Sequence, residues 1–217
     1  MDVRSFPGFP RPRAPALPDL LAPRTARVER NTAETRVAVS LALDAADPSY
    51  SHATGVGFLD HMLDLFARHG RFGLEVTCDG DLHVDDHHTV EDVGIALGQA
   101  FDNALGDKAY VARYGHAYVP MDEALGRCAV DLSGRGFAVV EAGLRRDKVG
   151  DLSCEMVPHF WRSFAEHARI TLHLDVLRGD NDHHRIEAAF KAAARALRMA
   201  VARDASGDKL PSTKEAL

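Results

Sequence analysis

Two short stretches of the sequence combine paired histidines with carboxylates in a way that suits metal binding. DDHHTVED spans residues 85–92 and NDHHRIEA spans residues 181–188, so each carries the pattern HHxxE at the expected start of a helix. On a helix, the Glu lies about 40° around the axis from the first His and about 60° from the second. The two histidines themselves lie about 100° apart. The first His and the Glu can therefore hold one ion, while the second His is free to face a different ion.

The two motifs are parts of an internal repeat. The segment HMLDLFARHG, residues 61–70, matches HFWRSFAEHA, residues 159–168, at a spacing of 98 positions, and the HHxxE motifs match at a spacing of 96. An ordered series of matches of this kind indicates duplication. The candidate metal ligands thereby form symmetric pairs, which are His61 with His159, His87 with His183, His88 with His184, and Glu91 with Glu187.

These eight candidates define the chemistry of the predicted site. Divided by symmetry over two ions, they give each ion three imidazoles and one carboxylate. Such a set suits Mn, Fe, Co or Zn, and leaves two positions of an octahedral ion open for a substrate. The alternative is a pair of solvated helix starts whose acids only complement the helix dipole. Asp85, Asp86 and Asp182 are expected to cap the helices or to orient imidazoles. His69 and His167 occur at equivalent positions of the repeat, and each could either pack in the core or support a ligand.

Composition limits the classes of partner. The 217 residues carry a formal net charge of −6, which gives no general attraction to nucleic acid or to an anionic membrane. The three cysteines form no CxxC pair, which argues against a disulfide framework and a thiolate metal site. No apolar run approaches the roughly 20 residues of a membrane span. We expect a cytoplasmic protein whose partner is a small molecule.

Apolar periodicity predicts an α+β fold in which each half has the order strand, helix, strand, helix, packed as two layers of sheet and helices. In the first half the strands are expected at residues 35–43 and 74–78, and the helices at 55–70 and 89–106. In the second half the strands are expected within 127–144 and at 170–177, and the helices at 157–168 and 183–202. The predicted organisation is a flexible Pro-rich tail at 1–24, a first repeat half at 25–110 and a second at 111–204.

From about Arg27 to the C-terminus the chain resembles the imidazoleglycerol-phosphate dehydratase family of histidine biosynthesis. The resemblance rests on an ordered set of motifs, namely GFLDHML, DDHHTVED, PMDEAL, DLSGR, NDHHRIEAAFKA and LPSTK. It implies a lyase that removes water from D-erythro-imidazoleglycerol phosphate to give imidazole-acetol phosphate. It also implies two Mn²⁺ ions per active site and a large homo-oligomer built from trimers, with about 24 subunits. Glu215 replaces a usual Gly and Gly136 a common Pro, and neither is a proposed ligand.

The resemblance also implies roles for individual residues. The family's metal ligands fall on the eight positions above. A division that fits symmetry and helix geometry puts one set of four on each ion, which is His87, Glu91, His159 and His184 for one and His61, His88, His183 and Glu187 for the other. Glu34 is the expected catalytic base, with a plain strand-edge residue as the alternative. The expected contacts to the phosphate and the rest of the substrate are Arg113, Arg135, Lys191, Ser212 and Lys214, of which the last two lie in a substrate-binding tail at 205–217.

The implied chemistry explains why metal ions are needed. The proton to be removed is on a carbon beside the imidazole ring and is not acidified by any carbonyl. An imidazolate held between the ions can push electrons out as the hydroxyl leaves, through a diazafulvene-like intermediate. Two rival functions remain. A di-metal phosphohydrolase would need more bridging carboxylates, and a metal store or sensor would not need the predicted phosphate-binding residues.

Overall fold

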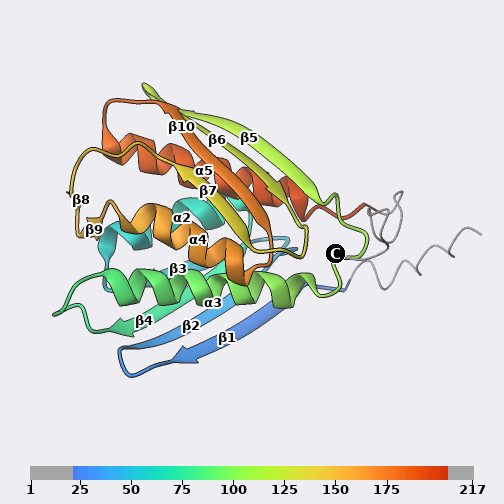
Figure 1. Cartoon of the computed structure of the whole chain (residues 1–217). Helices are drawn as coiled ribbons and strands as arrows, with labels where there is room; N and C mark the ends of the chain where they lie inside the picture. Colours follow the sequence, from blue (N-terminus) through green and yellow to red (C-terminus); the bar gives the residue numbers. More distant parts are fainter. Residues whose placement is uncertain (1–21, 205–217) are drawn as a thin grey trace, which may run out of the picture.

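Two four-stranded sheets enclose the helices of this protein, as the computed structural model shows for residues 22–204 (Figure 1). The first half contains β1 Thr25–Asn31, β2 Thr35–Ala42, β3 Tyr50–Ala53, α2 Gly57–Gly70, β4 Gly73–Gly80 and α3 His87–Leu105. The second half contains β5 Tyr114–Met121, β6 Ala124–Asp131, β7 Phe137–Glu141, α4 Met156–His167, β10 Thr171–Arg178 and α5 Asp182–Ala200. A small hairpin of β8 Lys148–Val149 and β9 Leu152–Ser153 precedes α4.

The two sheets have the same topology. Their strand orders are β1-β2-β4-β3 and β5-β6-β10-β7. In the first sheet β4 pairs antiparallel with β2 and parallel with β3, and in the second sheet β10 pairs antiparallel with β6 and parallel with β7. Equal order and equal strand direction in both halves confirm the predicted α+β fold with a duplicated half.

Each half holds more strands than the sequence predicts. In the two four-stranded sheets the additional strands are β1, β3 and β5, each at an edge of its sheet, and the short hairpin of β8 and β9 was not predicted either. In β1 alternate residues are exposed and the others only partly buried, so that Ala26 and Val28 are its only apolar contributions to the core. An edge strand with so few apolar residues gives almost no periodic signal. The predicted tails fall mostly outside the described residues, which exclude 1–21 and 205–217.

The helices form the middle of the structure and connect the two halves. α3 lies on β1 and β2, and α5 lies on β5 and β6. Between the sheets, α3 packs against α4 and α2 packs against α5 (Figure 1). Each helix pair therefore joins one helix from the first half with one from the second. Within residues 22–204, no helix combines the length and the apolar character that crossing a membrane requires.

Close contact between α3 and α4 depends on glycine. A Cβ added at Gly98 would lie 2.5 Å from the carbonyl oxygen of Phe164, which is closer than real Cβ atoms come to other atoms. Beside this contact, the buried rings of Phe101 and Phe164 meet edge to face with centroids 5.2 Å apart. The small residue thus lets the two helices approach until their aromatic side chains fill the core.

We predict that Gly98→Ala lowers the free energy of unfolding by about 1–3 kcal/mol, because the added methyl group forces α3 and α4 apart. Urea denaturation followed by circular dichroism measures the change. Gln99→Ala on the same helix is the control and should change stability by less than about 0.5 kcal/mol. Equal stability of the two variants would contradict the close approach.

Candidate metal centres

The HHxxE motifs lie at the first turns of α3 and α5. The backbone N–H of His183 donates to the Asn181 side chain over 2.9 Å, and the backbone N–H of His87 donates to Asp85 over 2.8 Å. These equivalent contacts satisfy backbone donors that would otherwise lack partners at the start of a helix. The predicted capping role of Asp85 is confirmed in this form.

Asp86 and Asp182 are buried beside these helix starts, and each binds the segment 145–153 rather than an imidazole. Asp86 accepts hydrogen bonds of 2.6 Å from both the backbone N–H and the hydroxyl of Ser153. Asp182 accepts from the backbone N–H groups of Arg145 and Arg146 over 2.9 and 2.7 Å. Burial alone would raise the pKa of Asp86, but the hydrogen bonds from Ser153 outweigh it and hold that pKa below its ordinary value.

The same segment also fixes the start of α2. The Asp151 carboxylate accepts from the backbone N–H groups of Gly57 and Phe58 over 2.6 and 2.9 Å. A single stretch of the second half thus binds the first turns of α2, α3 and α5. The first turns of α3 and α5 carry candidate ligands and His61 lies one turn into α2, so the segment helps to fix the positions of these ligands relative to one another.

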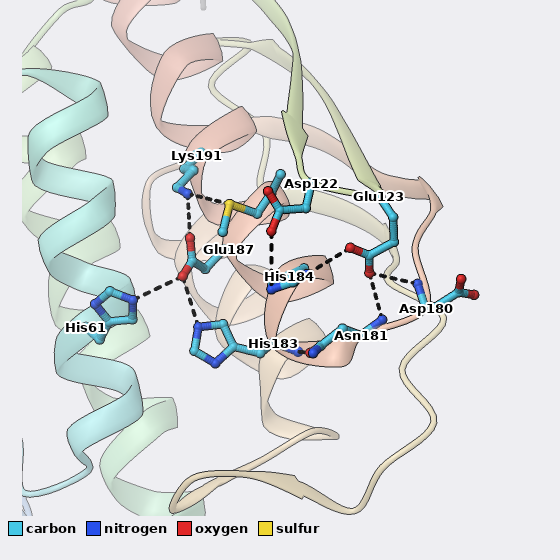
Figure 2. Close-up of polar contacts among 10 residues, drawn as sticks. His61, Asp122, Glu123, Asp180, Asn181, His183, His184, Glu187 and Lys191 are labelled. Carbon is cyan, nitrogen blue, oxygen red and sulfur yellow. Dashed lines mark hydrogen bonds and ion pairs between the residues drawn. The ribbon is translucent and has the colours of Figure 1, made fainter.

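The first cluster joins His61 of α2 with His183 and Glu187 of α5 (Figure 2). One oxygen of Glu187 lies 3.2 Å from Nε2 of His61 and 2.9 Å from Nε2 of His183. Burial opposes the charge of Glu187, but contacts with Lys191, His61 and His183 outweigh it and lower the pKa of this carboxyl to about 2. The carboxylate is therefore ionised at neutral pH and available to a cation.

The second cluster is built in the same way from the other helix pair. It joins His87 and Glu91 of α3 with His159 of α4. Nε2 of His159 lies 3.0 Å from the Glu91 carboxylate, and the rings of His87 and His159 have centroids 5.0 Å apart. In both clusters the three candidate ligand atoms lie within 4.8 Å of one another. Three convergent nitrogen and oxygen donors without a thiolate fit a divalent ion such as Mn²⁺.

The second histidine of each pair lies outside the clusters of its own chain. Nδ1 of His88 lies 3.1 Å from Asp81, and Nδ1 of His184 lies 2.8 Å from Glu123 (Figure 2). The hydrogen bond to Asp81 raises the pKa of His88, and the one to Glu123 raises the pKa of His184. Each contact occupies Nδ1 and leaves Nε2 as the nitrogen for a further ligand. The structure thus brings together three members of each predicted ligand set and leaves the fourth apart.

Carboxylates beside the second histidines are features that sequence reasoning missed. Glu123 accepts from the backbone N–H groups of Asp180 and Asn181, and these contacts together with His184 lower its pKa to about 2. Asp122 lies 3.8 Å from Nε2 of His184, as Glu34 does from Nε2 of His88. The motif PMDEAL contains both Asp122 and Glu123, so the sequence held an indication of these two carboxylates. No motif indicated Asp81.

The expected substrate contacts are widely separated within one chain. Lys191 lies at the first cluster, where it binds Glu187. Arg113 pairs with Asp131 at 2.7 Å, which raises the pKa of the guanidinium, and its backbone N–H donates to the carbonyl of Ala200. Because Ala200 and Glu187 lie at opposite ends of α5, Arg113 is about 20 Å from that cluster at 1.5 Å per helical residue.

Of the remaining expected contacts, Arg135 is described and belongs to neither cluster. Arg135 lies in the connection between β6 and β7, where its guanidinium donates to the carbonyl of Ser133 over 3.5 Å. Ser212 and Lys214 lie outside the described residues. The roles of all five substrate contacts therefore stay predictions.

Fold and site together define a class of protein: a duplicated α+β chain whose halves jointly form two His/His/Glu clusters suited to divalent ions. The family model for imidazoleglycerol-phosphate dehydratase matches residues 54–197. The enzyme of that name from Salinibacter ruber is 66% identical over 196 residues, which cover 90% of this chain and 96% of the relative. The chain therefore belongs to the imidazoleglycerol-phosphate dehydratase family, a family of lyases in histidine biosynthesis, as the motifs predicted.

Solved structures support the same assignment. Imidazoleglycerol-phosphate dehydratase from Staphylococcus aureus is similar with a TM-score of 0.72 and 41% identity, covering 82% of this chain and 99% of that one. IGPD from Pyrococcus furiosus, solved in complex with (S)-C348, is similar with a TM-score of 0.75 and 33% identity, covering 88% of this chain and 100% of that one.

We predict that Asp86→Ala lowers the free energy of unfolding by about 1–3 kcal/mol, because it leaves the partly buried N–H and hydroxyl of Ser153 without this acceptor. It should also weaken Mn²⁺ binding, since the first turn of α3 loses its anchor. Thermal unfolding and a metal titration measure the two effects. Asp79→Ala, which removes only an exposed pair with Arg36, is the control. A variant as stable as this control would show that Asp86 does not fix the helix start.

Proposed function

We propose that this protein removes water from D-erythro-imidazoleglycerol phosphate to form imidazole-acetol phosphate, with two Mn²⁺ ions per active site. The observation that carries the proposal is the pair of His/His/Glu clusters in a chain of this family. The three cysteines, none in a CxxC pair, favour a reducing compartment, and we therefore place the reaction in the cytoplasm.

The proposed ligands are the eight residues of the two symmetric sets. One ion would be held by His61, His183 and Glu187, and the other by His87, Glu91 and His159. Each set would be completed by one of the outward histidines, which are His88 and His184, the second histidines of the HHxxE motifs. When bound, the ions would accept the imidazole of the substrate and stabilise the negative charge that its ring develops. Among residues 22–204 each cluster contains one carboxylate, which does not favour a phosphohydrolase with a carboxylate-bridged metal pair.

Glu34 is the proposed base for the carbon-bound proton. It lies in the turn between β1 and β2, is half exposed, and has a carboxylate oxygen 3.8 Å from Nε2 of His88. A base next to a ligand histidine would face a substrate imidazole that reaches the same ion. Glu34 therefore has access both to the solvent and to the proposed reacting carbon.

The proposed active site needs more than one copy of the chain. Within one chain, Lys191 lies at the middle of α5 with its ammonium group on Glu187, whereas Arg113 pairs with Asp131 and lies beside Ala200 at the end of that helix. The two cations are therefore held apart, and we do not expect them to bind one phosphate from the same chain. The outward histidines likewise belong to neither cluster of their own chain among the described residues. A second copy would bring these residues together, and a homo-oligomer built from trimers, with about 24 subunits, supplies such copies.

The outer face of the second sheet also suits contact between copies. Large apolar or aromatic side chains are exposed on its strands, which are Tyr114, Tyr118, Phe137 and Leu177. Concentrations of exposed apolar surface are typical of protein interfaces. The corresponding face of the first sheet is covered mainly by small and charged residues, among them Arg27, Glu29 and Glu75.

The test of the proposed reaction is incubation of the Mn-loaded protein with imidazoleglycerol phosphate, followed by mass spectrometry. We expect the substrate to lose one water. Glu34→Gln should bind the same amount of Mn²⁺ but lose turnover by at least about 100-fold, because it cannot accept the proton. No water loss by the unmodified protein would refute the reaction, and unchanged turnover of the variant would exclude Glu34 as the base.

Sites shared between copies are tested by mixing inactive variants. His88→Ala and His183→Ala should each be inactive alone, while oligomers reassembled from both should regain activity in up to roughly a quarter of their sites. Restoration is expected because one copy then supplies an intact cluster and another supplies an intact outward histidine. Mixing His61→Ala with His183→Ala, which damage the same cluster of one chain, is the control and should restore nothing. Equal failure of both mixtures would place each site within one chain.

A further inference from the structure

A largely buried lysine side chain distinguishes the first cluster from the second. Lys191 follows Glu187 by one turn of α5, and its ammonium group donates a hydrogen bond to the Glu187 carboxylate (Figure 2). The oxygen that it binds is Oε2, whereas Oε1 faces His61 and His183. The ammonium group also lies 3.2 Å from the sulfur of Met121, and the lysine side chain is only 13% exposed. The cation is therefore held beside the metal-binding carboxylate.

The second cluster has no equivalent of this cation. The repeat places Ile95 at the position of Lys191, four residues after Glu91. Among residues 22–204, the ion pair that Glu91 makes is with His159. The Glu91 side chain is 36% exposed, compared with 8% for Glu187. Two clusters with the same donor types thus differ in charge and in access to water.

We propose that Lys191 makes the two ion sites unequal and couples one of them to the phosphate of the substrate. This inference rests on the proposed function. With the site free of phosphate, the ammonium group occupies one carboxylate oxygen and repels an incoming cation, and burial strengthens that repulsion. The cluster of His61, His183 and Glu187 then binds its ion more weakly than the cluster of His87, Glu91 and His159.

A phosphate group changes this balance. When its oxygens bind Lys191, the ammonium group is drawn from Glu187 and its charge is neutralised, so the ion at the first cluster binds more tightly. Thermodynamic linkage requires the reverse effect to be equal, so that the ion tightens phosphate binding by the same factor. The second cluster would fill first, and the ion of the first cluster and the phosphate would then bind cooperatively.

The test is a Mn²⁺ titration of the full-length, metal-stripped oligomer, with free Mn²⁺ measured by electron paramagnetic resonance. We expect two classes of site that differ by roughly tenfold or more in affinity. His159→Ala should retain the weaker class and His61→Ala the tighter one. Inorganic phosphate should increase the Mn²⁺ affinity of the weaker class alone. It is added at constant ionic strength and at a concentration that leaves the Mn²⁺ signal unchanged in the absence of protein.

Exchange of residues between the two halves gives the decisive variants. Lys191→Ile should merge the two classes and abolish the phosphate effect. The control is Arg195→Gln, which removes an exposed cation one turn further along α5. Gln is the residue at the equivalent position of the first half, so this variant is also an exchange between halves. It should leave the affinities of both classes of site unchanged. Ile95→Lys should weaken the second cluster, which keeps the test decisive if Lys191→Ile does not fold.

Three results would overturn the inference. They are one class of site in the unmodified protein, two classes that persist in Lys191→Ile, and a phosphate effect that persists in that variant. Failure of the proposed reaction would instead show as absence of water loss from imidazoleglycerol phosphate with both ions bound. The titrations do not depend on that outcome, so the two failures can be told apart.

Discussion

Packing of the two helix layers against each other is the constraint on which the rest of the structure depends. An HHxxE motif supplies only two ligands to an ion, and the third comes from a helix of the other half. His61 reaches Glu187 because α2 packs on α5, and His159 reaches Glu91 because α4 packs on α3. Neither half contains a complete cluster. The close approach of α3 and α4 that Gly98 permits therefore helps to set the distances among the ligands of the second candidate cluster.

The parts of this protein that could be predicted from sequence are those with local or repeated signals. Helical periodicity located the four helices within residues 22–204, and the repeat paired the candidate ligands. Edge strands such as β1 escaped because they place few apolar residues in the core. The contact of Asp86 with Ser153 could not be predicted for a different reason. Ser153 lies 67 positions away in sequence, and nothing local indicates that the two residues will meet. Contacts of this kind arise from the packing of the halves and are found only in three dimensions.

Duplication explains both the symmetry of the site and its departures from symmetry. Two copies of one half give equal topology and equal ligand types, so the clusters have the same geometry at first order. Each copy is then free to vary around the ligands. Lys191 and Ile95 occupy equivalent positions in the repeat, but only Lys191 places a positive charge beside its cluster. A duplicated fold can thus assign different tasks to two ions without any change in the residues that hold them.

The second histidine of each HHxxE pair, His88 or His184, has a defined position without belonging to a cluster of its own chain. Glu123 contacts Nδ1 of His184 and also accepts hydrogen bonds from the backbone N–H groups of Asp180 and Asn181, just before α5. The orientation of His184 is thereby fixed to the same helix start that carries the inward His183. Any movement of that helix start would shift both rings together. The adjacency of the histidines prevents them from sharing one ion, and under the proposed function it would hold two ions at a constant separation.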